Sequence, residues 1–203
     1  MGEIVLVRHG ETEWNRLGRF RGRADVPLNE NGLRDADATA QRIADGWEIA
    51  AVYSSPVRRA LQTAEILAAA TGRPAKLVDD LADVQYGQWE GLTRQEAAAR
   101  DPETMKMFLE APSRVRIPGG ETLHEAQTRA FNALIRLAAQ HADEAIAVVA
   151  HTEVNRLILL AALGGNIDHI WRVGQDTCAI NVLRIAGARI DVVSVNDRCH
   201  IGE

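Results

Sequence analysis

Short apolar runs rich in β-branched residues, separated by longer helical patterns, most constrain what this chain can fold into. Two such runs are Ile4 to Val7 and Ile146 to Ala150, and a third covers Ile49 to Tyr53. A strand that is apolar at every position is buried on both faces, which is typical of a parallel sheet covered by helices. We therefore expect these three segments to be inner strands of one sheet.

Helical periodicity alternates with these runs and predicts helices over 31–44, 57–71, 93–100, 122–140 and 153–163. Ser55 and Pro56 are expected to be the N-cap and first residue of the second helix, and Gly72 its end. Near the C-terminus, Cys178 to Ile185 and Ile190 to Val195 predict two antiparallel strands. The fold class is therefore α/β: a three-layer sandwich whose mostly parallel central sheet is flanked by helices.

The chain has 203 residues, of which 46% are hydrophobic, enough for one continuous core. We expect a single domain over residues 1–203, with residues 92–118 as a small helical cap. This cap segment is polar, and its three prolines, Pro102, Pro112 and Pro118, prevent one long helix. It is the segment expected to cover a functional site.

Charge and composition exclude several classes of function. The net charge of −5 argues against nucleic acid as a partner, because that binding needs a basic surface. The apolar runs are far shorter than the roughly 20 residues of a membrane span, and the first residues lack an export signal. A cytoplasmic location is expected. Cys178 and Cys199 lack the partner histidines of a zinc site and are interpreted as packing residues, so neither metal nor cofactor is predicted.

Basic and nucleophilic side chains follow the predicted inner strands directly. The first strand ends in Arg8 and His9, the strand at Ile146 ends in His151, and the third leads into Arg58 and Arg59. Carboxyl ends of parallel strands meet at one edge of a sheet, where ligands bind. A single histidine at a strand end is more often structural, but this combination can bind a phosphate, and phosphoryl transfer is the chemistry it favours.

Within such a site His9 is the preferred nucleophile, since a neutral imidazole can attack phosphorus when its other nitrogen is hydrogen-bonded. His151 would help to bind the phosphoryl oxygens. The leaving alkoxide needs a proton, and Asp83 is the preferred donor, with Glu90 as the competitor. Arg21 belongs to an arginine-rich stretch that could attract an anion or could simply be a solvated loop.

An ordered set of short motifs then resembles the histidine phosphatase superfamily, which includes the cofactor-dependent phosphoglycerate mutases. The motifs are Arg8-His9-Gly10-Glu11-Thr12 with Asn15, Ser54 to Ala60 with Gln62-Thr63-Ala64, Tyr86-Gly87 with Trp89-Glu90-Gly91, Pro118 to Glu121, and Val149 to Thr152. Their order covers nearly the whole chain. The resemblance implies a phosphoglycerate mutase-like fold.

The resemblance also implies roles for individual residues. His9 corresponds to the phosphorylated nucleophile, and Arg8, Arg59 and His151 to the rest of the phosphate pocket, with Asp83 as proton donor. The predicted substrate-binding residues are Asn15, Thr12, Arg21, Gly22, Arg58, Glu121, Thr152 and His200. Two departures from the family pattern stand out: Asp83 replaces the glutamate frequent in mutases, and Arg21-Gly22 makes the pocket mouth more basic.

We therefore expect a metal-independent phosphatase acting on a small phosphorylated metabolite through a phosphohistidine on His9. The chain lacks the insertions and long tail of similar mutases, which favours hydrolysis over mutase activity. A mutase, an inactive phosphate-binding module and a metal hydrolase using His9, His151 and Asp83 are the alternatives. Phosphoglycerate, phosphoserine, sugar phosphates and α-ribazole phosphate all stay open as substrates, and exposed edge strands make a homodimer conceivable.

Overall fold

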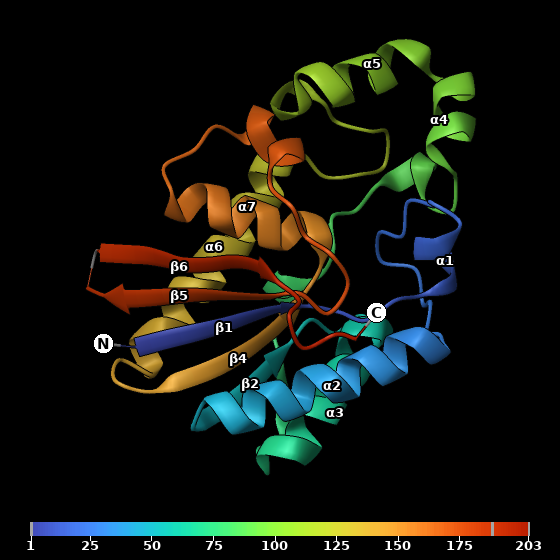
Figure 1. The fold of residues 1–203 in the computed structure, drawn as a ribbon. Coiled ribbons are helices and arrows are strands. Elements are labelled where there is room, and N and C mark those ends of the chain that lie inside the picture. Colours follow the sequence, from blue (N-terminus) through green and yellow to red (C-terminus); the bar gives the residue numbers. More distant parts are fainter. Residues whose placement is uncertain (1, 188, 203) are drawn as a thin grey trace.

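A six-stranded sheet forms the centre of the computed structural model, which describes residues 2–187 and 189–202 (Figure 1). Its strands are β1 (Gly2–Arg8), β2 (Ile49–Ser54), β3 (Ala75–Leu77), β4 (Ala145–Ala150), β5 (Ile180–Ala186) and β6 (Arg189–Asp197). They lie in the order β3-β2-β4-β1-β5-β6. The first four strands of this order are parallel to one another, β5 is antiparallel to β1, and β6 is antiparallel to β5. The prediction of a mostly parallel sheet with an antiparallel pair from the tail is confirmed.

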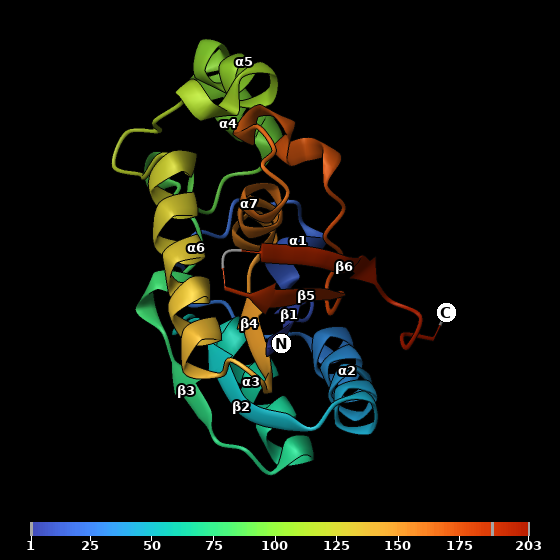
Figure 2. The ribbon, with the colours of Figure 1, turned by 90° about the vertical axis from the view of Figure 1, so that its left-hand side faces the viewer.

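Helices cover both faces of the sheet and extend beyond one end of it (Figure 2). They are α1 (Glu13–Arg16), α2 (Glu30–Gly46), α3 (Arg58–Thr71), α4 (Arg94–Arg100), α5 (Pro102–Glu110), α6 (Leu123–Gln140) and α7 (Thr152–Ala162). Short 3-10 turns cover Asp79–Leu81, Gly87–Trp89, Pro112–Arg114 and Ile167–Arg172. Helices α2 and α3 lie on one face and α6 and α7 on the other, which gives the three layers expected from the sequence.

Alternate residues of β1 supply the two apolar cores. Val5 and Val7 belong to the cluster shared with α2 and α3, whereas Ile4 and Leu6 belong to the cluster shared with α6 and α7. All four are at most 1% exposed. Burying each such side chain stabilises the fold by about 1.5–3 kcal/mol. The sheet is therefore held firmly from both sides, and its strand ends are fixed in position.

Residues 92–118 form a small helical segment at one end of the molecule, which contains α4 and α5 (Figure 1). Pro102 begins α5, and Asp101 caps it by accepting a hydrogen bond from the Thr104 amide at 3.1 Å. Phe108 packs against Phe20 and Trp89, with ring centroids 5.9 and 5.4 Å away. These aromatic contacts attach the segment to the loop that follows β1.

Two local predictions were wrong. Helix α3 begins at Arg58 after an N-cap at Val57 that makes no side-chain hydrogen bond. The hydroxyl of Ser55, expected to cap that helix, instead accepts from the Val57 amide at 3.2 Å and pairs with His151 Nε2 at 2.8 Å. Strand β3 was not predicted, because three half-exposed residues at a sheet edge give no apolar pattern. Gly72 does end α3, in the left-handed conformation with φ of 67°.

The two cysteines also differ from each other. Cys178 is buried and fits its predicted packing role, but Cys199 is exposed, so that its interpretation as a packing residue was wrong. None of the helices in the described part of the chain is both long and apolar enough to span a membrane.

Candidate active site

The parallel arrangement of β1, β2 and β4 brings the residues that follow them to one edge of the sheet. His9 follows β1 and His151 follows β4, and the His9 amide donates to the Ala150 carbonyl at 3.0 Å. The two imidazole rings are both fully buried, with centroids 5.2 Å apart. A pair of buried histidines therefore lies where the sheet can present them to a ligand.

The ring of His9 is held in one orientation by two contacts. Its Nδ1 lies 2.6 Å from the carbonyl oxygen of Gly10, so Nδ1 carries the proton and donates it. Its Nε2 accepts a hydrogen bond from Arg59 Nε at 3.2 Å. Burial, and then the positive charge of Arg59, holds the pKa of His9 well below its usual value. His9 is therefore a neutral imidazole with an unprotonated Nε2.

Arg59 connects His9 to a carboxylate. Its Nη2 donates to Asp83 Oδ2 at 2.6 Å and to the Gly22 carbonyl at 2.7 Å, and the side chain is fully buried. Burial lowers the pKa of Arg59, and Asp83 opposes that shift. The neighbouring Arg58 points elsewhere: it is half exposed and lies 3.6 Å from Asp25. Only the second arginine of this pair reaches the histidines.

Asp83 lies between Arg59 and His151. Its Oδ1 accepts from the Val84 amide at 2.9 Å, and its Oδ2 is 3.6 Å from His151 Nδ1. Burial, and then Arg59, lowers the pKa of His151 well below the usual value, so this ring is neutral as well. We call His9, Arg59, Asp83 and His151 the buried cradle.

Glu90, the competing proton donor, holds a loop. Its Oε1 accepts from the Arg23 amide at 3.2 Å, and its carboxyl group packs against Gly22. Gly22 has φ of 50°, and a Cβ added there would lie 2.0 Å from Glu90 Oε1. Glycine is therefore favoured at this position, where its carbonyl accepts a hydrogen bond from Arg59.

Several buried polar atoms around the cradle have no protein hydrogen-bond partner among the described residues. They are Arg8 Nε, Arg21 Nε, His151 Nδ1 and Thr152 Oγ1. Arg8 is fixed by a hydrogen bond from Nη1 to the Gln175 carbonyl, and burial followed by the charge of Arg21 lowers its pKa to about 9, so that it remains cationic at neutral pH. A buried polar group without a partner costs about 1–3 kcal/mol. Donors of this kind gathered around two histidines are suited to an anion.

The other residues singled out from the sequence have structural partners. Thr12 and Asn15 form the capping box of α1, where Asn15 Oδ1 accepts from the Thr12 hydroxyl at 2.8 Å. Glu121 pairs with Arg129 at 2.6 Å and accepts from the Gln85 amide at 2.9 Å. Glu121 therefore supports the segment that carries Asp83.

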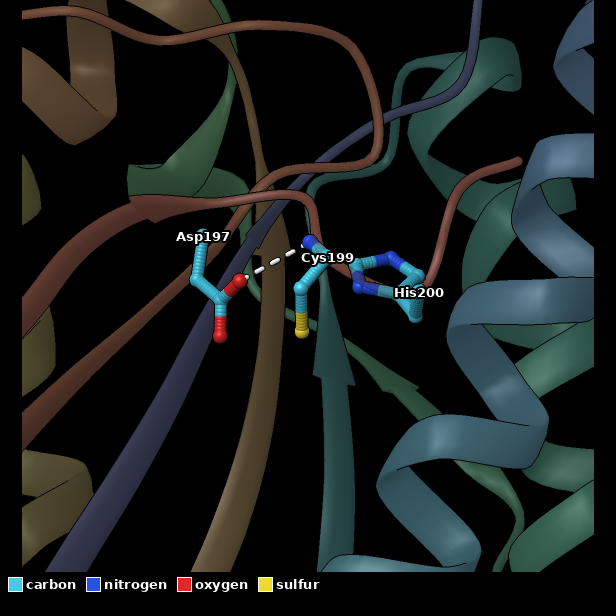
Figure 3. Close-up of side chains that lie close together, drawn as sticks. All are labelled: Asp197, Cys199 and His200. Atoms are coloured by element: carbon cyan, nitrogen blue, oxygen red, sulfur yellow. Dashed lines mark hydrogen bonds between the residues drawn. The ribbon is translucent and has the colours of Figure 1, made fainter. Parts of the chain in front are cut away.

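The C-terminal tail places His200 away from the cradle residues, against α2. Its Nε2 lies 3.0 Å from Thr39 Oγ1. Asp197, Cys199 and His200 form a group whose potential metal-ligand atoms all lie within 4.8 Å of one another (Figure 3). The sequence interpretation that no histidine partners Cys199 was therefore wrong. Asp197 Oδ1 already accepts from the Cys199 amide at 2.9 Å, and local hydrogen bonds account for the arrangement.

A cavity of about 540 Å³ is lined by none of the four cradle residues but by two of their neighbours: Arg21, whose charge lowers the pKa of His9, and Glu153, two residues after His151. We call it the outer pocket; its charged and aromatic lining consists of Arg19, Phe20, Arg21, Tyr86, Arg94 and Glu153. Sequence reasoning missed Arg94 and Glu153. The available signal for Glu153 was a carboxylate directly after His151-Thr152, at the start of a helix that ends in a long apolar run.

Helices cover both faces of the sheet, and two neutral histidines and buried guanidinium groups lie at its edge. This combination is typical of phosphomonoesterases that act through histidine. The chain belongs to the histidine phosphatase superfamily (branch 1), whose family model matches residues 4–198. Its fold is the phosphoglycerate mutase-like α/β fold, and it is a phosphatase of small metabolites.

Two curated relatives and two solved structures illustrate the similarity. Phosphoserine phosphatase 1 of Hydrogenobacter thermophilus is 31% identical over 203 residues, which cover 100% of this chain and 96% of the relative. The metal-independent phosphoserine phosphatase of Arabidopsis thaliana is 40% identical over 198 residues, which cover 97% of this chain and 77% of the relative. The structure of Bacillus stearothermophilus YhfR has a TM-score of 0.93 at 31% identity and covers 98% of this chain and 99% of that one.

The second structure is a mutant of phosphoserine phosphatase from Entamoeba histolytica in complex with phosphoserine. It has a TM-score of 0.89 at 27% identity and covers 99% of this chain and 100% of that one. A further structure of the Entamoeba protein, at the same identity, contains 3-phosphoglyceric acid.

Proposed function

We propose that this protein hydrolyses small phosphomonoesters through a covalent phosphohistidine on His9. The observation that carries the proposal is the tautomer of His9: Nδ1 donates to the Gly10 carbonyl, and the lone pair of Nε2 faces Arg59. An imidazole in this state is an unprotonated nucleophile with a guanidinium beside it. A neutral ring also avoids the loss of nucleophilicity that protonation would cause.

In the first step, His9 Nε2 forms a bond to phosphorus while the bond from phosphorus to the ester oxygen breaks. A phosphoryl group at Nε2 takes the place of the present hydrogen bond, and Arg59 then donates to the phosphoryl oxygens. Arg8 and His151 supply further donors, which include the presently unpartnered Arg8 Nε. Donors positioned around the transferring group provide most of the catalysis in phosphoryl transfer.

Asp83 is proposed to transfer the proton to the departing alkoxide. A dianionic phosphate competes for Arg59 and so releases Asp83 Oδ2 from its present ion pair, and the released carboxylate takes up a proton from solvent before it protonates the alkoxide. In the second step, Asp83 accepts a proton from water, which attacks phosphorus and regenerates free His9. Each cycle consumes one water molecule and releases one alcohol and one inorganic phosphate.

The physiological substrate is proposed to be a phosphorylated hydroxy acid or amino acid. Two relatives are named as phosphoserine phosphatases, and the Entamoeba structures contain phosphoserine and 3-phosphoglyceric acid. The cytoplasmic location and the homodimer stay predictions from the sequence. Residues 92–118 are proposed to act as the cap of a single domain, since the first turn of α4 lines the outer pocket.

The test is hydrolysis of p-nitrophenyl phosphate in excess chelator by the wild-type chain, by His9→Ala and by His169→Ala. His169 is an exposed residue of a 3-10 turn and serves as the matched control. We expect turnover and acid-labile phosphate labelling to disappear in His9→Ala and to persist in His169→Ala. Turnover retained by His9→Ala would refute the proposal, and tight phosphate-ester binding without phosphate release would favour a binding module.

A further inference from the structure

Glu153 is a buried carboxylate that the proposed reaction does not use. It lies in the first turn of α7, two residues after His151, and is 7% exposed. Its Oε2 has no hydrogen-bond partner among the described residues. Its Oε1 is 3.8 Å from Arg156 Nη1, which is beyond hydrogen-bond distance. Glu153 therefore has hydrogen-bonding capacity that the fold leaves unused.

Arg156 is not free to approach Glu153 more closely. Its Nε donates to the Val173 carbonyl at 2.7 Å, and its guanidinium lies 5.9 Å from the ring centroid of Trp171. The charges of Arg8 and Arg59 also act on Glu153, but no described residue donates a hydrogen bond to its Oε2, so this buried oxygen stays unsatisfied. The side chain lines the outer pocket, so that a ligand in this pocket can reach it.

The position of this carboxylate conflicts with a purely anionic substrate. The cradle is built to hold a phosphate dianion, and a further negative charge at the pocket wall repels an anion that carries no compensating group. The conflict disappears when the alcohol part of the substrate carries a positive charge. An ammonium group would donate to Glu153 Oε2 and form a charge-assisted hydrogen bond.

Arginines in the same pocket supply the opposite charge. Arg21 has an unpartnered buried Nε, and Arg94 lies with its guanidinium 5.9 Å from the ring centroid of Trp171. The pocket therefore presents cations for a carboxylate and one buried anion for an ammonium group. A phosphate ester that bears both groups on one carbon atom matches this distribution.

We infer that Glu153 selects phosphomonoesters whose alcohol is an α-amino acid, by pairing its free carboxylate oxygen with the substrate ammonium group. The inference rests on the proposed phosphatase function and specifies its substrate class. The carboxylate distinguishes an ammonium group from a hydroxyl group, because only the ammonium compensates its buried charge.

Two probes isolate this interaction. Phosphoserine and 3-phosphoglycerate have the same carbon skeleton, phosphate and carboxylate, and differ by an ammonium group in place of a hydroxyl. We measure kcat/KM for both with the wild-type chain, Glu153→Gln, Glu153→Asp and the control Glu65→Gln. Glu65 is an exposed carboxylate on α3, outside the outer pocket lining. p-Nitrophenyl phosphate, which carries neither group, is measured in parallel.

The wild-type chain should prefer phosphoserine to 3-phosphoglycerate, and Glu153→Gln should lower this preference about 10- to 100-fold, the range of a hydrogen bond to a charged group. Glu153→Asp should keep part of the preference, and Glu65→Gln should keep it within about twofold. A preference unchanged in Glu153→Gln, or equal losses on both substrates, would overturn the inference.

The aryl phosphate separates the two proposals. If the wild-type chain hydrolyses it without preferring phosphoserine, the assignment of Glu153 is wrong and the phosphatase stands. If no phosphate ester is hydrolysed, both proposals fail. Circular dichroism and thermal unfolding check each variant, and if Glu153→Gln does not fold, the wild-type preference and Glu153→Asp decide.

Discussion

The buried cradle and the outer pocket differ in how their charged side chains are held. In the cradle, Arg59 and Asp83 are at most 1% exposed and contact each other at 2.6 Å, and each also contacts a histidine. In the outer pocket, Arg94 is exposed, and Glu153 has an unpartnered oxygen. The charges of the cradle are therefore fixed by mutual contacts, whereas those of the pocket have fewer partners. We propose that the cradle carries out the reaction and that the pocket selects the substrate.

Replacing the two adjacent arginines of α3, one at a time, should give the largest difference between the cradle and an exposed position. Arg59→Ala should reduce kcat by about 10³-fold, since it removes a donor to the phosphoryl group. It should also lower the free energy of unfolding by about 3–5 kcal/mol, because Asp83 is left buried and unpaired. Arg58→Ala removes an exposed pair and should change stability by less than about 1 kcal/mol. Steady-state kinetics and urea unfolding of both variants test this; equal effects would contradict the division.

The second prediction concerns the proton donor. Asp83→Asn should lower kcat for an alkyl phosphate by about 10²-fold or more, because its alkoxide needs a proton. The loss should be smaller for p-nitrophenyl phosphate, whose phenolate leaves without one. Glu90→Gln should affect both substrates alike, since Glu90 holds the loop at Arg23. Similar losses for both esters in Asp83→Asn would assign the proton transfer to another group.

The third prediction is a pH dependence of stability. The pKa values of His9 and His151 are held well below about 6.5, the value expected for the unfolded chain. The unfolded state therefore binds more protons, and the free energy of unfolding falls as the pH drops below about 6.5. Each histidine contributes at most about 1.4 kcal/mol per pH unit. Its contribution is fully present above that pH.

Urea unfolding at pH 7.0 and 5.5 measures this slope. His9→Asn should flatten it, and His169→Ala, an exposed control, should leave it as in the wild-type chain. A His9→Asn variant with the full wild-type slope would mean that the cradle histidines are not neutral in the folded protein.

The smallest effect is expected in the outer pocket. Arg94→Gln should raise KM for a carboxylate-bearing substrate about three- to tenfold with little change in kcat, because an exposed cation contributes modestly to binding. The same variant should leave KM for p-nitrophenyl phosphate within about twofold. A large fall in kcat would mean that Arg94 takes part in the reaction, and would contradict the proposed division of roles between the cradle and the outer pocket.

The sequence was sufficient to predict the sheet, apart from the edge strand β3, and the residues that converge at its edge. Parallel strands have a fixed edge for ligands, so His9 and His151 could be placed together before any coordinates were known. Their catalytic roles stay a proposal. Ser55 was misassigned because a helix-cap pattern does not reveal that a distant histidine uses the hydroxyl.

Other positions depend on contacts that periodicity does not encode. Arg94 and Glu153 line the same pocket because the loop after β1, the start of α4 and the first turn of α7 surround it. The tail residue His200, expected to touch substrate, lies against Thr39 because the chain turns toward α2 after β6. Loops and tails of this kind are set by tertiary packing, and their local sequence favours no single path.

The contact between His9 Nδ1 and the Gly10 carbonyl has an evolutionary consequence. The acceptor is a main-chain oxygen, so it does not depend on the identity of a side chain, but its position depends on Gly10, where a Cβ would lie 2.5 Å from the Gly32 carbonyl oxygen. While residue 10 stays glycine, the protonation pattern of the proposed nucleophile does not depend on the side chains that surround it. The residues that line the outer pocket can therefore differ between related proteins with different substrates, while the proposed attacking nitrogen, His9 Nε2, stays unprotonated.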